Sequence, residues 1–122
     1  MASKSRYRGG YCDAYALAIH RLHDYPLAVV RGYWYDPEWE SEEYEDCHVV
    51  AVKEPGVYLD VDGEHSRDDL VRRCLFGGPV ERVEIEPVSE EEARFLFTME
   101  GVPDADIDEA ATCALRYGWP GS

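Results

Sequence analysis

The stretch that decides the fold runs from Gly9 to Leu22 and reads Gly-Gly-Tyr-Cys-Asp-Ala-Tyr-Ala-Leu-Ala-Ile-His-Arg-Leu. Two glycines precede Cys12, and most residues after it are apolar and many are small. A helix that is apolar on all sides is typically buried, so we expect a buried helix from about Tyr11 to His23. A cysteine in the first turn lies at the positive end of the helix dipole, where a thiolate is stabilised.

Length and composition predict a single domain. The chain has 122 residues, of which 45% are hydrophobic, enough for one core. We expect residues 1–8 to form a flexible tail and residues 9–119 to form one α+β domain. No apolar run approaches the roughly 18 residues that a membrane span needs, and the N-terminus lacks the apolar region of a signal peptide. These features favour a cytoplasmic protein without a membrane partner.

Charge is the unusual bulk property. The chain has 26 acidic and 12 basic residues, for a net charge of −14. Binding of nucleic acid through its phosphates needs a basic face, so this mode is disfavoured. Three interpretations of the acidity stay open: solubility, a basic partner or substrate, and an inhibitor that mimics nucleic acid.

The spacing of the cysteines argues against a zinc site. The chain has four, at positions 12, 47, 74 and 113, and no two of them form a CxxC pair. Without a signal peptide we expect all four to be reduced thiols. Cys74 lies on the apolar stripe of an expected helix and is interpreted as a buried structural thiol. We expect no metal and no other cofactor.

The middle of the chain predicts strands around an acidic loop. Residues 27–35 are rich in β-branched and aromatic side chains and are expected to form a strand. Residues 36–46 hold seven acids and no base, and are interpreted as a loop. Two interpretations of this loop stay open: a solvated connector, or a lip over a cleft in which Trp39 or Tyr44 touches substrate.

A hairpin is expected after this loop, with strands at 47–52 and 57–61 joined by Glu54-Pro55-Gly56. In the expected register Val50 faces Asp60 and His48 faces Asp62, which places His48 and both aspartates on one face. A shift of one residue would turn both aspartates to the opposite face.

Further elements follow the hairpin. Ser66 and Ser89 each have the pattern of a helix N-cap, residues 80–86 alternate as a strand, and residues 107–115 predict a last amphipathic helix. The fold class is therefore α+β: a buried N-terminal helix on a mostly antiparallel sheet of about four strands, with additional C-terminal helices.

Three residues along this fold could form a catalytic triad. A cysteine nucleophile needs a nearby base and a third group that orients the base. The chain offers Cys12 at a helix start, His48 at a strand start and Asp60 on the next strand, with Asp62 as the alternative to Asp60. In order and setting, the segments Gly10–Ala16, His48–Val52 and Tyr58–Asp60 resemble the papain-like and transglutaminase-like thiol enzymes. The resemblance spans residues 9–63.

The resemblance implies a papain-like or transglutaminase-like core and a cysteine-dependent hydrolase or acyltransferase. Such enzymes include peptidases, isopeptidases, deamidases and transglutaminases, so the implied substrate is a protein or peptide, and the charge leaves a basic one open. Cys12 would attack a carbonyl or carboxamide carbon, His48 would move the proton, and Asp60 would orient His48. The candidate substrate-binding residues are Tyr11, Trp34, Trp39, Tyr44 and Asp62.

The chain departs from the papain pattern because it contains no glutamine, the usual side-chain oxyanion donor before the cysteine. Backbone amides, Tyr7, Arg8 or Tyr11 would have to supply that donor. Two alternatives therefore stay open. One is a non-catalytic acidic interaction or inhibitor protein, for example one encoded by a mobile element, that binds a basic partner or mimics nucleic acid. The other is a degenerate member of the thiol-enzyme fold that only binds.

Overall fold

The computed structural model describes residues 12–60, 63–75, 80–97 and 99–117, with the side chains of residues 12 and 113–117 left outside the description. The expected tail at 1–8 lies outside the described residues, as do Tyr11 and Asp62. Within the described part, no helix is both long enough and apolar enough to cross a bilayer.

The expected N-terminal helix is present and buried. Helix α2 runs from Cys12 to His23, and the residues from Asp13 to Ile19 are all buried. The helix ends at Asp24, whose backbone N–H donates to the carbonyl of His20 at 2.8 Å and whose φ of 57° turns the chain away. An aspartate tolerates this left-handed conformation better than most residues do.

The sheet has five strands, and every neighbouring pair is antiparallel. The order across the sheet is β4-β3-β2-β1-β5. The bounds are β1 Leu27–Asp36, β2 Ser41–Glu54, β3 Val57–Asp60, β4 Gly63–His65 and β5 Arg82–Val88. The fold is thus α+β, as expected, and the short edge strand β4 is the one that the sequence did not indicate.

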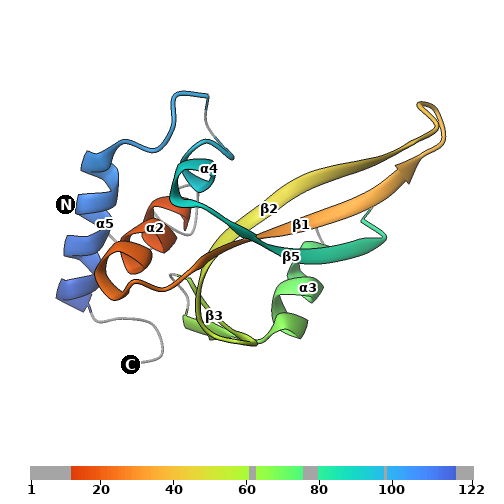
Figure 1. Cartoon of the computed structure of the whole chain (residues 1–122). Helices are drawn as coiled ribbons and strands as arrows, with labels where there is room; N and C mark the ends of the chain where they lie inside the picture. Colours follow the sequence, from red (N-terminus) through yellow and green to blue (C-terminus); the bar gives the residue numbers. More distant parts are fainter. Residues whose placement is uncertain (1–11, 61–62, 76–79, 98, 118–122) are drawn as a thin grey trace.

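The acidic stretch is mostly strand, so its interpretation as a loop was wrong. Only Pro37–Glu40 form a turn, and β1 and β2 pair on either side of it up to Asp36 and Ser41. Cross-strand pairs such as Tyr33 with Tyr44 support this ribbon. Strand β5 accompanies β1 only as far as Tyr33, so the ribbon beyond that point projects from the rest of the sheet (Figure 1). Residues 34–45 are here called the arm, with Tyr44 and Glu45 at its base beside Tyr33 and Gly32.

Helices cover both faces of the sheet at the base of the arm (Figure 1). Helices α2, α4 (Glu90–Arg94) and α5 (Asp104–Tyr117) lie on one face. Their core with the sheet includes Ala14, Leu17, Leu27, Val49, Ala51, Leu59, Ala93, Ile107 and Ala110. Helix α3 (Arg67–Leu75) covers the other face, with a core of Ala28, Val30, Val50, Leu70, Cys74 and Val83.

Serine N-caps begin two of these helices, as the sequence indicates. The backbone N–H of Asp69 donates to Ser66 Oγ at 3.2 Å at the start of α3. The backbone N–H of Glu92 donates to Ser89 Oγ at 3.1 Å at the start of α4. Both bonds satisfy an N–H group that has no partner inside the helix.

A disulfide joins Cys47 on β2 to Cys74 on α3, with the two Cα atoms 6.2 Å apart. The expectation that all cysteines are reduced was therefore wrong for this pair. Cys74 is buried as expected, but as half of a disulfide. The two residues are 27 positions apart in the chain, and only the packing of α3 against the sheet brings them together, which no spacing rule reveals.

Candidate functional site

Three neighbouring strands bring together two histidines and one aspartate. His48 lies on β2, Asp60 is the last residue of β3, and His65 is the last residue of β4. His48 Nε2 lies 2.9 Å from Asp60 Oδ2, and His65 Nε2 lies 2.8 Å from Asp60 Oδ1. Each carboxylate oxygen of Asp60 thus has an imidazole partner of its own.

The strand register explains why these side chains meet. Ala51 pairs with Leu59 and Val52 with Tyr58, which is the register expected from the sequence at these positions. A shift follows between Val52 and Glu54, closer to the turn than the site. The same face carries His48 and Asp60, because side chains two residues apart along a strand point the same way.

Asp60 is a buried carboxyl group whose charge is compensated. The residue is 1% exposed, and an uncompensated carboxylate at such a position would cost several kcal/mol. Besides the two imidazoles, Arg73 on α3 places Nη1 3.9 Å from Asp60 Oδ2. An ionised carboxylate only accepts hydrogen bonds, so the Nε2 atoms of both histidines act as the donors. In a neutral His48 the remaining lone pair is then on Nδ1, which makes that atom the basic one.

The start of α2 carries a buried acid beside Cys12. Helix α2 begins at Cys12, and the Cys12 side chain lies outside the described part of the structure. Asp13, the next residue, is 4% exposed, and its Oδ1 accepts the backbone N–H of Ala14 at 2.9 Å. Burial raises the pKa of Asp13 and the carboxylate of Asp106 adds to this rise, while the backbone hydrogen bonds and His48 lower the pKa by less.

The expected substrate-binding residues are not gathered at this cluster. Trp34 lies on β1 and is partly buried. Trp39 is 73% exposed in the turn of the arm, and Tyr44 is 58% exposed on β2. Tyr11 and Asp62 are outside the described residues. All three described residues, Trp34, Trp39 and Tyr44, belong to the arm, which points away from α2 (Figure 1).

His65 is the member of the cluster that the sequence analysis missed, since only its neighbour Ser66 was singled out there, as a helix N-cap. It is 8% exposed and pairs with Tyr58 across β3 and β4. The available signal was Asp62-Gly63, a dipeptide typical of tight hairpin turns. Continuing a strand past that turn would have placed His65 on the same face as Asp60.

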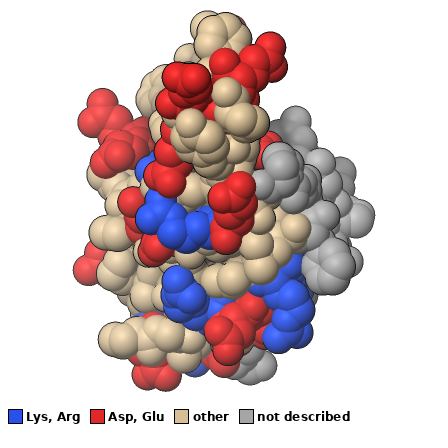
Figure 2. Space-filling view, turned by 90° about the vertical axis from the view of Figure 1, so that its right-hand side faces the viewer, with Lys and Arg blue, Asp and Glu red and all other residues tan. Residues whose placement is uncertain are grey.

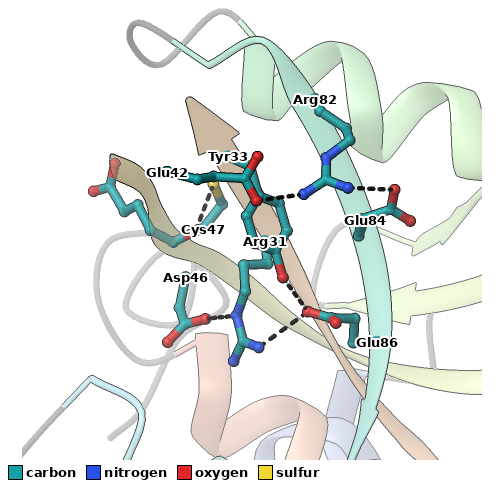
Figure 3. Close-up of polar contacts among 9 residues, drawn as sticks. Arg31, Tyr33, Glu42, Asp46, Cys47, Arg82, Glu84 and Glu86 are labelled. Carbon is teal, nitrogen blue, oxygen red and sulfur yellow. Dashed lines mark hydrogen bonds and ion pairs between the residues drawn. The ribbon is translucent and has the colours of Figure 1, made fainter. Parts of the chain in front are cut away.

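A second polar network lies at the base of the arm, where it connects β1, β2 and β5 (Figure 3). Arg31 Nε donates to Asp46 Oδ1 at 2.6 Å, and Arg31 Nη1 donates to Glu86 Oε2 at 3.0 Å. Tyr33 Oη donates to Glu86 Oε2 at 2.8 Å. Desolvation is the largest single effect and lowers the pKa of Arg31, but its contacts with Asp46, Tyr33 and Glu86 together raise that pKa above its usual value, so the guanidinium stays charged. This network is suited to holding strands together.

Acidic side chains gather at the far end of the arm. Figure 2 views the molecule from the side to which the arm points: Asp and Glu predominate at the top, whereas Lys and Arg alternate with Asp and Glu in the middle and lower parts. Arg82, which belongs to β5, bonds Glu42 of the arm at 2.9 Å and places its guanidinium carbon 4.3 Å from the centre of the Tyr33 ring. The acids nearer the tip have no Lys or Arg neighbours within the arm itself, because residues 34–45 include neither type.

Comparison of the chain with protein-family models, curated proteins and solved structures gives no match. The function is therefore argued from the geometry of the cluster.

Proposed function

We propose that the protein is a small cysteine-dependent hydrolase or acyltransferase with Cys12 as nucleophile, His48 as base and Asp60 as the group that orients the base. The observation that carries this proposal is the 2.9 Å bond between His48 Nε2 and the buried Asp60. The placement of α2 against an antiparallel sheet supports the papain-like or transglutaminase-like core.

The geometry of His48 suits the role of a base. Its Nε2 is engaged with Asp60, so Nδ1 is the atom that would take the proton from the Cys12 thiol. The positive end of the helix dipole would further stabilise the Cys12 thiolate.

The proposed reaction is acyl transfer through a thioester. Cys12 Sγ gives its proton to His48 Nδ1 and attacks a carbonyl or carboxamide carbon of a protein or peptide substrate. Backbone N–H groups at the start of α2 would hold the oxyanion. The C–N bond then breaks and the leaving amine takes the proton from His48. Water or a second amine attacks the thioester, giving hydrolysis or acyl transfer, and releases Cys12.

Selective alkylation tests this proposal. With Cys47 and Cys74 in a disulfide, iodoacetamide at neutral pH compares the thiols of Cys12 and Cys113, read out by peptide mass spectrometry. We expect Cys12 to react at least about tenfold faster, the factor that 1.4 kcal/mol of thiolate stabilisation gives. The variant His48→Ala should remove the difference.

The matched control is His23→Ala, which removes an exposed histidine at the far end of α2 and should leave the rate at Cys12 unchanged. Equal alkylation rates at Cys12 and Cys113 in the unaltered protein would end the enzyme proposal. So would a fast alkylation of Cys12 whose rate does not change in His48→Ala.

A second candidate function is that of an acidic interaction protein, and the arm favours it. The arm carries six acids and no base, and its aromatic residues Tyr35, Trp39 and Tyr44 are 53%, 73% and 58% exposed. Exposed aromatic rings beside carboxylates suit Lys and Arg side chains, which bind carboxylates and aromatic faces. The partner would be a basic protein segment.

Fluorescence of Trp39 provides the test of this second candidate. The protein is titrated with a Lys- and Arg-rich peptide, and binding is followed by tryptophan emission with Trp34 replaced by Phe to reduce background. Glu38→Lys with Glu40→Lys should abolish binding, whereas the equal charge change Glu91→Lys with Asp108→Lys, at exposed helix positions, should weaken it only slightly. Cys12→Ser should bind normally. Equal losses in both charge variants would contradict a role for the arm.

A further inference from the structure

Asp60 receives two imidazoles on two different oxygens, and only one of them belongs to the proposed triad. His48 bonds Oδ2 from β2, while His65 bonds Oδ1 from β4. His65 is more deeply buried than His48, with side-chain exposures of 8% and 22%. The aspartate is therefore held from both sides by donors on separate strands.

This arrangement bears on the orientation of Asp60. The terminal torsion of an aspartate is broad, because rotation about its sp³–sp² bond has no sharp staggered minima. A single hydrogen bond to Oδ2 would leave the carboxylate plane loosely defined. A second bond to Oδ1 from another strand fixes the plane and with it the direction in which Oδ2 meets His48.

The burial of Asp60 makes the hydrogen bond from His65 energetically important as well. Asp60 is 1% exposed, so removing the donor from Oδ1 would leave that oxygen with a desolvation cost. Arg73 does not replace this donor, because its Nη1 is 3.9 Å from Oδ2, the oxygen that His48 already bonds, and its side chain is 55% exposed. Loss of the bond from His65 would therefore weaken the hold on the carboxylate plane, and with it the bond to His48.

We propose that His65 is a positioning residue that acts through Asp60 to hold His48 as its Nε2–H tautomer, with Nδ1 kept as the basic atom. The inference rests on the proposed function for its catalytic meaning, since the basic Nδ1 matters to the chemistry only if Cys12 is the nucleophile. The tautomer of His48 itself is measurable without any turnover.

The test compares three substitutions at one position. His65→Gln keeps an N–H donor where Nε2 stood, so it can still bond Asp60 Oδ1. His65→Asn retains polarity, but its shorter amide does not reach that oxygen. His65→Leu removes the donor. Two readouts are measured for each variant: the ring ¹⁵N shifts of His48, which report its tautomer, and the rate of Cys12 alkylation by iodoacetamide.

In the unaltered protein and in His65→Gln, we expect the Nε2–H tautomer of His48 to dominate and the alkylation rates to agree within about twofold. In His65→Leu and His65→Asn, the ¹⁵N shifts should move toward a mixture of tautomers, and the alkylation rate should fall about tenfold, the factor of one hydrogen bond to a charged group. The Asn variant keeps the test decisive if the Leu variant does not fold.

Two results separate this inference from the proposed function. Unchanged ¹⁵N shifts in His65→Asn, or a failure of His65→Gln to restore them, would overturn the positioning role of His65 even if Cys12 is fast and depends on His48. If Cys12 is alkylated slowly in the unaltered protein, the proposed function is overturned. If the tautomer of His48 nevertheless changes with the donor at position 65, the positioning role of His65 stands.

Discussion

Asp13 shows a conflict between burial and charge at the start of α2. The residue is 4% exposed, and burial raises its pKa despite the hydrogen bond from the N–H of Ala14, which lowers it. A buried acid of this kind reduces stability when it is ionised. It stands next to Cys12, where stability alone would favour a neutral side chain.

The pH dependence of this effect can be predicted. Because the pKa of Asp13 is raised in the folded state, the folded protein binds more protons than the unfolded chain at pH values just above 3.8, the ordinary pKa of an aspartate. Stability therefore falls as pH rises from that value through the folded pKa. Asp13→Asn should raise the free energy of unfolding at pH 7, and this gain should vanish as pH falls toward 3.8, as measured by urea midpoints.

The exposed aspartate of α5, Asp108, provides the control, and Asp108→Asn should not give this pH-dependent gain. An Asp13→Asn protein that is less stable than the original at pH 7 would show that the hydrogen bond to Ala14 outweighs the burial of the charge.

At single residues, the sequence could predict part of the cluster. His48 and Asp60 were placed on one face from strand alternation and a three-residue turn, and both indications are local. His65 depends on where β4 folds back on β3, which a three-residue strand signals weakly. The position of the Cys12 sulfur relative to His48 remains a prediction.

At the scale of elements, the arm shows where composition misleads. Seven acids in eleven residues suggested a solvated loop, yet cross-strand contacts override that tendency. The guanidinium carbon of Arg31 lies 4.8 Å from the centre of the Tyr44 ring, and its Nε binds Asp46. These partners come from the opposite strand, so the strand character of residues 41–46 was not visible from local composition.

The disulfide between β2 and α3 is a cross-link whose effect on stability can be measured. It closes a loop of 27 residues in sequence separation, and restricting the unfolded chain over such a loop contributes about 2–4 kcal/mol. Replacing both residues, with Cys47→Ser and Cys74→Ala, should lower the free energy of unfolding by about that amount, as measured by urea denaturation.

Treatment of the unaltered protein with a reductant should give the same loss, whereas the double variant should not respond to the reductant. Two results together would show that the disulfide is absent in solution. The reductant would leave the urea midpoint of the unaltered protein unchanged, and mass spectrometry after alkylation would detect no additional thiols.

For the whole molecule, the net charge of −14 predicts a response to salt. Like charges repel one another most in the compact state, and salt screens them over roughly 8 Å at 0.15 M ionic strength. Raising NaCl from about 0.02 M to about 0.2 M should therefore increase the urea midpoint. KCl should act equally, because screening does not depend on the ion.

Ion pairs on the surface oppose this trend. Arg82 with Glu42 and Arg21 with Glu90 are attractions that salt weakens, although exposed pairs of this kind contribute little. A midpoint that falls with salt would mean that such pairs outweigh the general repulsion.

The overall arrangement was predictable in outline. A buried first helix, antiparallel strands and capped helices all follow from hydrophobic periodicity and cap residues, and all are present. The placement of α3 on one face and of three helices on the other is decided by long-range packing. For that reason the disulfide did not follow from the sequence.

The unequal lengths of the strands have a consequence for the motions of the backbone. Strand β2 pairs with β3 only from Ala51 onward, and β5 accompanies β1 only to Tyr33. In the arm, each strand thus has one described neighbour, and half of its amide groups face outward. Local opening there breaks few contacts. Amide protons near Trp39 should consequently exchange with deuterium long before those of Val29 and Val49, so that the chain loosens from the tip inward.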